Sequence, residues 1–160
     1  MIEIYTIGVY NSTETEFFSK LKNHDIDLFC DIRQRRGVRG AQYKFVNSLY
    51  LQSKLKNMGI KYIYVKALAP TSSIREKQKQ ADVINKETKK QRKELGIVFK
   101  QEYSSQIINS FDFNEFVNEL AALNAKRVVL FCVEENAKAC HRSLVAKELS
   151  QRYNFNVIDL

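Results

Sequence analysis

Four consecutive residues near the end of the chain, Cys140, His141, Arg142 and Ser143, carry side chains that could do chemistry. A deprotonated thiol is a nucleophile, an imidazole carries protons near neutral pH, and a guanidinium binds anions. The four residues follow the apolar stretch Arg127–Val133 and open the helical pattern His141–Tyr153. A helix start offers free backbone amides and a partial positive charge, which attract anions and lower the pKa of a thiol.

Cys140 is therefore the candidate nucleophile, and His141 is its candidate proton carrier. Cys30 and Cys132 lie inside apolar runs, where a cysteine is usually a small buried hydrophobe. Arg142 and Ser143 would hold an anion with the amides of this helix start. The alternative is structural, because Cys140 could also be a cap or packing residue.

A basic loop, Arg33–Lys44, is the second feature that suggests chemistry. It holds five basic residues, two glycines and no acidic residue. Guanidinium groups match phosphate oxygens, which gives four candidate phosphate ligands: Arg33, Arg35, Arg36 and Arg39. Tyr43 and Phe45 could stack on bases or pack into the core.

Asp31 precedes this loop and has two interpretations. It could act as a catalytic base, or it could pair with Arg33 and orient the loop.

A metal site is disfavoured by spacing. Seven residues separate Cys132 from Cys140, whereas zinc ligands usually stand two to four residues apart. The adjacent side chains of Cys140 and His141 are expected to point in different directions. We therefore expect no metal and no cofactor.

The elements that must position these residues alternate between strand and helix. Strands are predicted at Ile2–Gly8, Ile26–Ile32, Ile60–Leu68, Arg127–Val133 and Phe155–Leu160. This alternation predicts an α/β fold in a single domain, residues 1–160, with a mostly parallel five-stranded sheet and helices on both faces. Residues 70–110 form a polar helical insertion, interpreted either as a lid or as a solvated helical face.

Ligands of parallel sheets bind at the carboxyl ends of the strands. This rule selects Gly8–Asn11, which contains the candidate ligand Tyr10, together with Asp31–Arg39 and Cys132–Ser143. All three segments are expected to meet at one edge of the sheet.

The composition sets the class of protein. The 160-residue chain carries a net charge of +8 and is 44% hydrophobic, so a globular fold with anionic partners is expected. The first residues do not form a signal peptide pattern, no apolar run reaches membrane-spanning length, and three cysteines do not make a disulfide framework. A cytoplasmic protein without a membrane partner is the expectation, and the oligomeric state is left open.

Four short motifs carry a resemblance to a known family. In order they are Tyr5–Gly8, Asp31–Arg33, Leu68–Thr71 and Cys140–Ser143. Together they resemble the bacterial and archaeal family called domain of unknown function 488. The resemblance implies a compact α/β domain with the second and fourth motifs at one site, and it implies no reaction.

From these features we predict an enzyme that acts on a phosphate-bearing substrate, either a nucleotide or a nucleic acid. The first alternative is a non-catalytic nucleic-acid-binding module that uses the same arginines and a helix over Arg75–Lys93. The second alternative is a thiol-based redox protein. A concave pocket at Cys140 would favour the enzyme, and a close approach of Cys132 to Cys140 would favour redox chemistry.

Overall fold

Five parallel strands form the centre of the protein. The computed structural model describes residues 1–87 and 93–160. The strands are β1 (Glu3–Ile7), β2 (Leu28–Asp31), β3 (Lys61–Tyr64), β4 (Arg127–Phe131) and β5 (Asn156–Asp159). Their order across the sheet is β3-β2-β4-β1-β5, and every neighbouring pair is parallel. The predicted α/β fold is confirmed.

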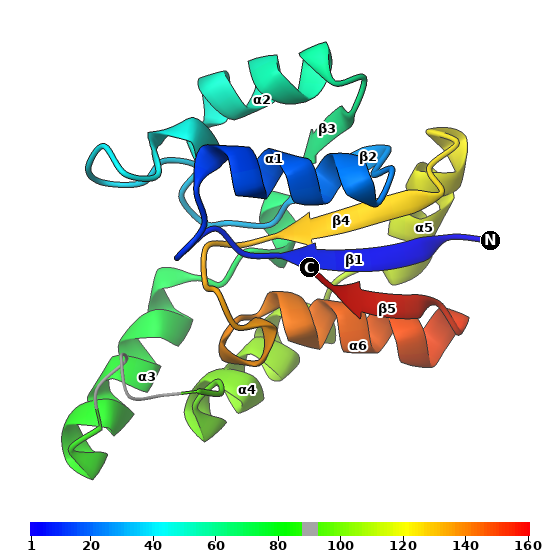
Figure 1. Ribbon diagram of the computed structural model, residues 1–160. Coiled ribbons are helices and arrows are strands. Elements are labelled where there is room, and N and C mark those ends of the chain that lie inside the picture. The colour runs from blue at the N-terminus through cyan, green and yellow to red at the C-terminus, as the bar shows by residue number, and fades with distance from the viewer. Residues whose placement is uncertain (88–92) are drawn as a thin grey trace.

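Helices cover both faces of this sheet (Figure 1). They are α1 (Glu14–Asn23), α2 (Ser48–Asn57), α3 (Ser72–Asn85), α4 (Ile97–Tyr103), α5 (Phe113–Ala122) and α6 (Arg142–Tyr153). On one face, α1 and α2 pack against a core that includes Phe29 and Phe131. On the other, α3 to α6 pack against a core that includes Cys30, Ile32 and Leu130.

Local sequence signals explain where several helices begin. The Thr13 hydroxyl accepts a hydrogen bond from the Glu16 amide, and the Glu16 carboxylate accepts one from the Thr13 amide, which together form a capping box. The Asp112 carboxylate accepts a hydrogen bond from the Glu115 amide at the start of α5. The Asn47 side chain makes no capping hydrogen bond at the start of α2, and its oxygen accepts a hydrogen bond from the Val38 amide, which fixes the basic loop.

Two predicted elements differ from the observed ones. The third strand ends at Tyr64, because the chain turns into a short 3-10 helix at Lys66–Leu68. Within the predicted helical insertion at residues 70–110, helix α4 is followed directly by a π-helix at Ser104–Ile108. Such a π-turn widens a helix by one residue per turn and is invisible to a search for 3.6-residue periodicity.

The predicted insertion at residues 70–110 is only partly a solvated arm. Helix α3 exposes most of its side chains and projects from the sheet at the lower left of Figure 1, although Ile74 and Gln78 are buried. By contrast, Phe99, Tyr103 and Ile108 belong to the core. Residues 88–92, within the predicted insertion, lie outside the described residues, and a lid function remains a prediction.

Across the described ranges 1–87 and 93–160, no helix combines the length and the apolar character needed to cross a bilayer.

Candidate functional site around Cys140

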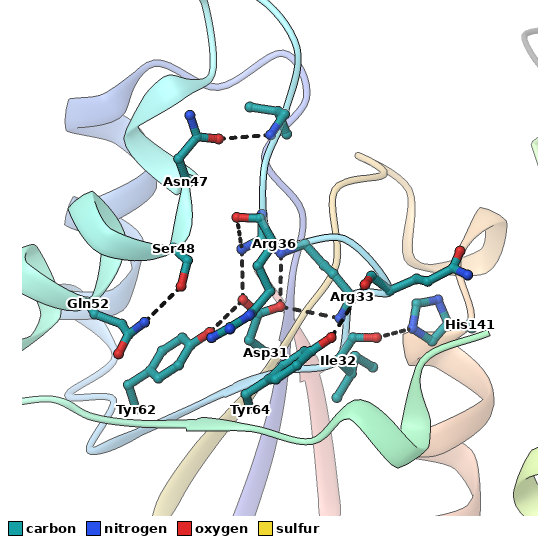
Figure 2. A network of polar contacts seen from close by, with 12 residues as sticks. Asp31, Ile32, Arg33, Arg36, Asn47, Ser48, Gln52, Tyr62, Tyr64 and His141 are labelled. Carbon is teal, nitrogen blue, oxygen red and sulfur yellow. Dashed lines mark hydrogen bonds and ion pairs between the residues drawn. The ribbon is translucent and has the colours of Figure 1, made fainter. Parts of the chain in front are cut away.

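A hydrogen bond joins Asp31–Arg39 to Cys132–Ser143, two of the segments predicted to form the site. The Nε2 atom of His141 lies 2.8 Å from the carbonyl oxygen of Ile32, which directly follows β2. Figure 2 shows this contact between the start of α6 and the Asp31–Arg33 segment. The predicted meeting of these two segments at one edge of the sheet is therefore confirmed.

The charged side chains of Asp31 and Arg33 nevertheless lie on the opposite face of the sheet from His141. Successive strand residues point to opposite sides, so Asp31 and Arg33 share a side with Phe29, whereas Cys30 and Ile32 point the other way. The Arg33 guanidinium lies 4.6 Å from the centre of the Phe131 ring, which belongs to the α1 and α2 face. His141 contacts the ring of Tyr103, which belongs to the α4 and α6 face.

Asp31 is held by a closed network of donors (Figure 2). Its carboxylate is fully buried and accepts hydrogen bonds from Arg33 Nε at 2.8 Å, Arg33 Nη2 at 2.7 Å and the Tyr62 hydroxyl at 2.9 Å. The predicted pairing of Asp31 with Arg33 is thus confirmed. The catalytic interpretation of Asp31 finds no support here, because its oxygens face Arg33 and Tyr62 rather than the thiol of Cys140.

Tyr62 and Arg36 extend this network toward solvent. Burial, together with the negative charge of Asp31, raises the pKa of Tyr62 to about 12 and keeps its hydroxyl a donor, although the hydrogen bond from Arg36 opposes this. The hydrogen bond to Tyr62 in turn raises the pKa of Arg36. The Arg36 guanidinium also stacks 4.2 Å above the Tyr64 ring.

The basic loop therefore divides into buried and exposed arginines. Arg33 is only 2% exposed, and its Nη1 is the single buried side-chain nitrogen or oxygen of residues 1–87 and 93–160 without a hydrogen-bond partner. Arg35 and Arg39 are exposed. Arg33 is used inside the protein as the partner of Asp31. Arg35 and Arg39 remain predicted anion contacts.

The aromatic residues next to this loop contact one another. Tyr10 lies against Tyr43 with ring centres 5.2 Å apart, and the Tyr43 hydroxyl accepts a hydrogen bond from the Asn11 amide. Phe45 is buried against Phe17 and Phe18. Phe45 is thus a core residue that is unable to stack on a base, and Tyr10 remains only a predicted ligand.

Arg142 holds the loop between β4 and α6. Its side chain is buried, with Nη1 2.6 Å from the Glu134 carbonyl oxygen, Nη2 3.0 Å from the Glu135 carbonyl oxygen and Nε 3.3 Å from the Thr6 hydroxyl. The loop also passes so close to Gly8 that a Cβ atom there would overlap the Glu134 carbonyl oxygen. This geometry gives Arg142 a structural role and argues against direct contact with an anion.

Several groups expected to bind an anion at the start of α6 form hydrogen bonds within the protein instead. The Cys140 amide donates to the Ala137 carbonyl oxygen, and the Ser143 amide donates to the Cys140 carbonyl oxygen. The Ser143 hydroxyl also donates to the Cys140 carbonyl oxygen, at 2.8 Å. These groups cap the turn, so the anion-binding role predicted for Ser143 has no support from the geometry.

The turn brings three soft ligand atoms together. The sulfurs of Cys132 and Cys140 and a ring nitrogen of His141 all lie within 4.8 Å of one another. The Cys140 Sγ lies 3.6 Å from His141 Nδ1. The expectation that Cys140 and His141 point apart is wrong, because the irregular turn before α6 lets both side chains face inward. Cys132 is buried, as interpreted from the sequence, and its sulfur also lies beside that of Cys140, which is the approach that favours the redox alternative.

The two thiols differ in acidity. Burial alone would raise the pKa of Cys140, but the hydrogen bond from Cys132 and the positive charges of His141 and Arg142 hold it well below its usual value. The hydrogen bond to Cys140, followed by burial, raises the pKa of Cys132 well above its usual value. Cys30 is fully buried in β2, and burial raises its pKa far above that of a free thiol. Cys140 is therefore the thiol most easily deprotonated.

A pocket opens beside this cluster. Its volume is about 330 Å³, and Cys132, Cys140 and His141 form part of its wall. Helix α3 contributes Arg75, Gln78, Lys79 and Asp82, which recur at the spacing of one helical face. The Gln78 side chain accepts a hydrogen bond from the Phe99 amide and so fixes α3 against α4. The site thus has a preformed pocket with the thiol of Cys140 in its wall.

Comparison with known proteins places the chain in a family. No curated protein and no solved structure matches it. The family model described as Domain of unknown function DUF488 matches residues 13–149, which includes β2, the basic loop, the pocket and Cys140. Since this match covers most of the 160-residue chain, the protein belongs to the family Domain of unknown function DUF488.

Proposed function

We propose that the protein is an enzyme in which Cys140 attacks a small substrate held in the pocket next to α3. The observation that carries this proposal is the contact of 3.6 Å between Cys140 Sγ and His141 Nδ1 in the wall of that pocket. A thiol next to an imidazole, whose other nitrogen is held by a third group, is the arrangement of an activated nucleophile. Here the third group is the Ile32 carbonyl oxygen.

The proposed reaction is transfer or hydrolysis through a covalent intermediate. The Cys140 thiol first gives its proton to His141 Nδ1, and the resulting thiolate Sγ then bonds to the electrophilic atom of the substrate. The bond from that atom to the leaving group breaks, and the leaving group takes the proton from Nδ1. Water, or a second acceptor, then attacks the intermediate, releases the product and returns a proton to the thiol.

The pocket favours an enzyme over a flat nucleic-acid-binding module. Small-molecule sites are concave and combine apolar walls with a few polar groups, whereas binding modules present an exposed basic face. The alternative module also required a basic helix over Arg75–Lys93. Helix α3 ends at Asn85, and part of that range, residues 88–92, lies outside the described residues.

We further propose that the substrate of this enzyme carries a phosphate group. The net charge of +8 attracts anions to the protein. Within the pocket, the cations Arg75 and Lys79 stand on α3, one helical turn apart. Asp82, Glu94 and Glu134 also line the pocket, so a phosphate group should lie against Arg75 and Lys79 while the remainder of the substrate is neutral.

The covalent step is testable with p-nitrophenyl acetate as an electrophilic probe. We expect a burst of p-nitrophenol and an acetyl group on Cys140, detected by mass spectrometry of peptides. Cys140→Ser should lose the burst, and Cys30→Ser, the matched control in the core, should keep it. A burst that persists in Cys140→Ser, or an acetyl group located on another residue, would refute the nucleophile.

The phosphate preference predicts a charge effect on alkylation. Iodoacetate is anionic and iodoacetamide is neutral, so the ratio of their rates at Cys140 reports the local potential. Replacing both Arg75 and Lys79 with glutamine should lower this ratio roughly 2- to 10-fold at low salt, because each exposed charge contributes up to about 1 kcal/mol. The control changes the exposed pair Arg35 and Arg39 to glutamine. If only the control lowers the ratio, the anion is recognised by the loop and not by α3.

A second candidate function, thiol-disulfide exchange, is favoured by the proximity of Cys132 to Cys140. Cys140 would attack a substrate disulfide and release one thiol. Cys132 would then attack the Cys140 sulfur, release the second thiol and leave a Cys132–Cys140 disulfide. Cys132→Ser separates the two candidates, because it would abolish disulfide reduction and leave the acetylation of Cys140 intact.

A further inference from the structure

We infer that Cys132, Cys140 and His141 form a binding site for Zn²⁺ with one coordination position open to the pocket. This inference uses the residues of the proposed enzyme, and a bound Zn²⁺ would occupy both Cys140 Sγ and His141 Nδ1, so the covalent reaction proposed above belongs to the zinc-free protein. Spacing in the sequence argued against such a site, and the spatial arrangement of the three side chains argues for it.

The first argument is the separation of the ligand atoms. Zinc bonds to thiolate sulfur at about 2.3 Å and to imidazole nitrogen at about 2.0–2.1 Å, so a tetrahedral ion places the two ligand atoms about 3.6 Å apart. The observed separation of Cys140 Sγ and His141 Nδ1 is 3.6 Å. The sulfur of Cys132 lies within 4.8 Å of the Cys140 sulfur and of a ring nitrogen of His141, so a small adjustment of this side chain completes a set of two sulfurs and one nitrogen.

The second argument is the orientation of His141. His141 is 3% exposed, and its Nε2 lies 2.8 Å from the Ile32 carbonyl oxygen. A carbonyl oxygen only accepts, so Nε2 carries a proton, and once Nδ1 has lost its own proton its lone pair is available to a metal ion next to Cys140 Sγ. Metal-binding histidines have this same hydrogen bond from the second ring nitrogen, and it fixes both the tautomer and the ring plane.

The third argument is that the loop between the two cysteines is already folded. Arg142 binds the carbonyl oxygens of Glu134 and Glu135, and its Nε is within hydrogen-bond distance of the Thr6 hydroxyl on β1. Zinc sites with short spacings rely on a tight turn to bring the ligands together. Here the buried guanidinium performs that task for a longer loop, which explains why a spacing rule fails to find the site.

The fourth argument concerns the type of site. Three protein ligands with a fourth position open to solvent or substrate are typical of catalytic zinc, whereas structural zinc has four protein ligands. Within residues 1–87 and 93–160, these three residues form the only group of three or more His, Cys, Asp or Glu side chains placed closely enough to share a metal ion, so no fourth protein ligand of these types is present there. All three also line the pocket of about 330 Å³, so water or a small anion from the pocket would be the fourth ligand. Two thiolates and one imidazole favour Zn²⁺ over Mg²⁺ or Ca²⁺.

The test is metal binding to the full chain after chelator treatment under reducing conditions. Isothermal titration with Zn²⁺ should give a single site, and Co²⁺ should give sulfur-to-cobalt charge-transfer absorption with the intense visible bands of tetrahedral cobalt. Cys132→Ser, Cys140→Ser and His141→Asn should each weaken Zn²⁺ binding by more than the roughly 10- to 100-fold that loss of an outer-shell partner costs. Cys30→Ser should bind like the unmodified chain.

A protection experiment avoids reliance on variants that fold poorly. Zn²⁺ added to the unmodified chain should block alkylation of both Cys132 and Cys140. Absence of a single site in the titration, or zinc that leaves both thiols reactive, would overturn the inference. If the chelator-treated protein still acetylates Cys140 while Zn²⁺ fails to bind, the proposed nucleophile stands and the metal site alone is refuted.

Discussion

Replacing Asp31 with asparagine is expected to lower the free energy of unfolding by about 3–5 kcal/mol. The carboxylate is fully buried and accepts two hydrogen bonds from the Arg33 side chain. The substitution leaves the buried guanidinium of Arg33 without its counter-charge, and one Arg33 nitrogen already has no hydrogen-bond partner. Leaving a buried cation without its partner lowers the free energy of unfolding far more than breaking an ion pair at the surface does. Urea unfolding of the two proteins measures the difference.

An exposed ion pair provides the matched control for this change. Lys100 and Glu94 are 3.6 Å apart, and the Glu94 side chain is 64% exposed. Glu94→Gln should change the free energy of unfolding by no more than about 1 kcal/mol, because solvent screens such pairs. If Asp31→Asn also loses only about 1 kcal/mol, the pair does not organise the start of the basic loop as described.

Replacing His141 with asparagine should slow alkylation of Cys140 by iodoacetamide about 10²- to 10⁴-fold, the usual contribution of a general base. Asparagine removes the ring nitrogen that lies 3.6 Å from Cys140 Sγ. Its side chain remains polar, so it can still form a hydrogen bond in the buried space. Stopped-flow or quenched labelling with peptide mass spectrometry gives the rate at Cys140 alone.

The same substitution at the other histidine is the control. His24 is exposed at the end of α1, where its Nδ1 lies 2.9 Å from the Lys20 carbonyl oxygen. His24→Asn should leave the rate at Cys140 unchanged. A loss of less than twofold in His141→Asn would mean that the imidazole does not activate the thiol.

Much of the fold follows from local sequence patterns. The alternation of apolar strands with capped helices predicts a parallel α/β sheet, because every strand must return through a crossover helix. The rule that ligands bind at the carboxyl ends of strands correctly brings together the segments around Ile32 and His141. Boundaries are less predictable, as the early end of β3 at Tyr64 illustrates.

The division of the candidate site between two faces was also accessible from the sequence. Strand alternation alone separates Asp31 and Arg33 from Cys30 and Ile32. The prediction instead combined all the arginines with Cys140 in one basic site, because each feature follows a strand end. Two segments that lie at the same edge of a sheet can still direct their side chains to opposite faces, and the side-chain direction decides which residues share a site.

The remainder of the site depends on tertiary contacts that no local pattern encodes. Arg142 looks like an anion ligand in the sequence, yet it is 1% exposed and binds three oxygen atoms of the protein. Cys132 looks like a core residue, and only the folded loop places its sulfur near Cys140. Both residues gain their roles from the path of the chain between β4 and α6.

Site-resolved alkylation of the native, chelator-treated protein tests the central claim most directly. Iodoacetamide is added at neutral pH in substoichiometric amount, and peptide mass spectrometry then quantifies modification of each cysteine. The account predicts that Cys140 reacts first, that Cys132 reacts more slowly because its pKa is raised, and that Cys30 reacts only after unfolding. Equal rates at Cys140 and Cys132, or modification of Cys132 first, would contradict the assignment of Cys140 as the nucleophile.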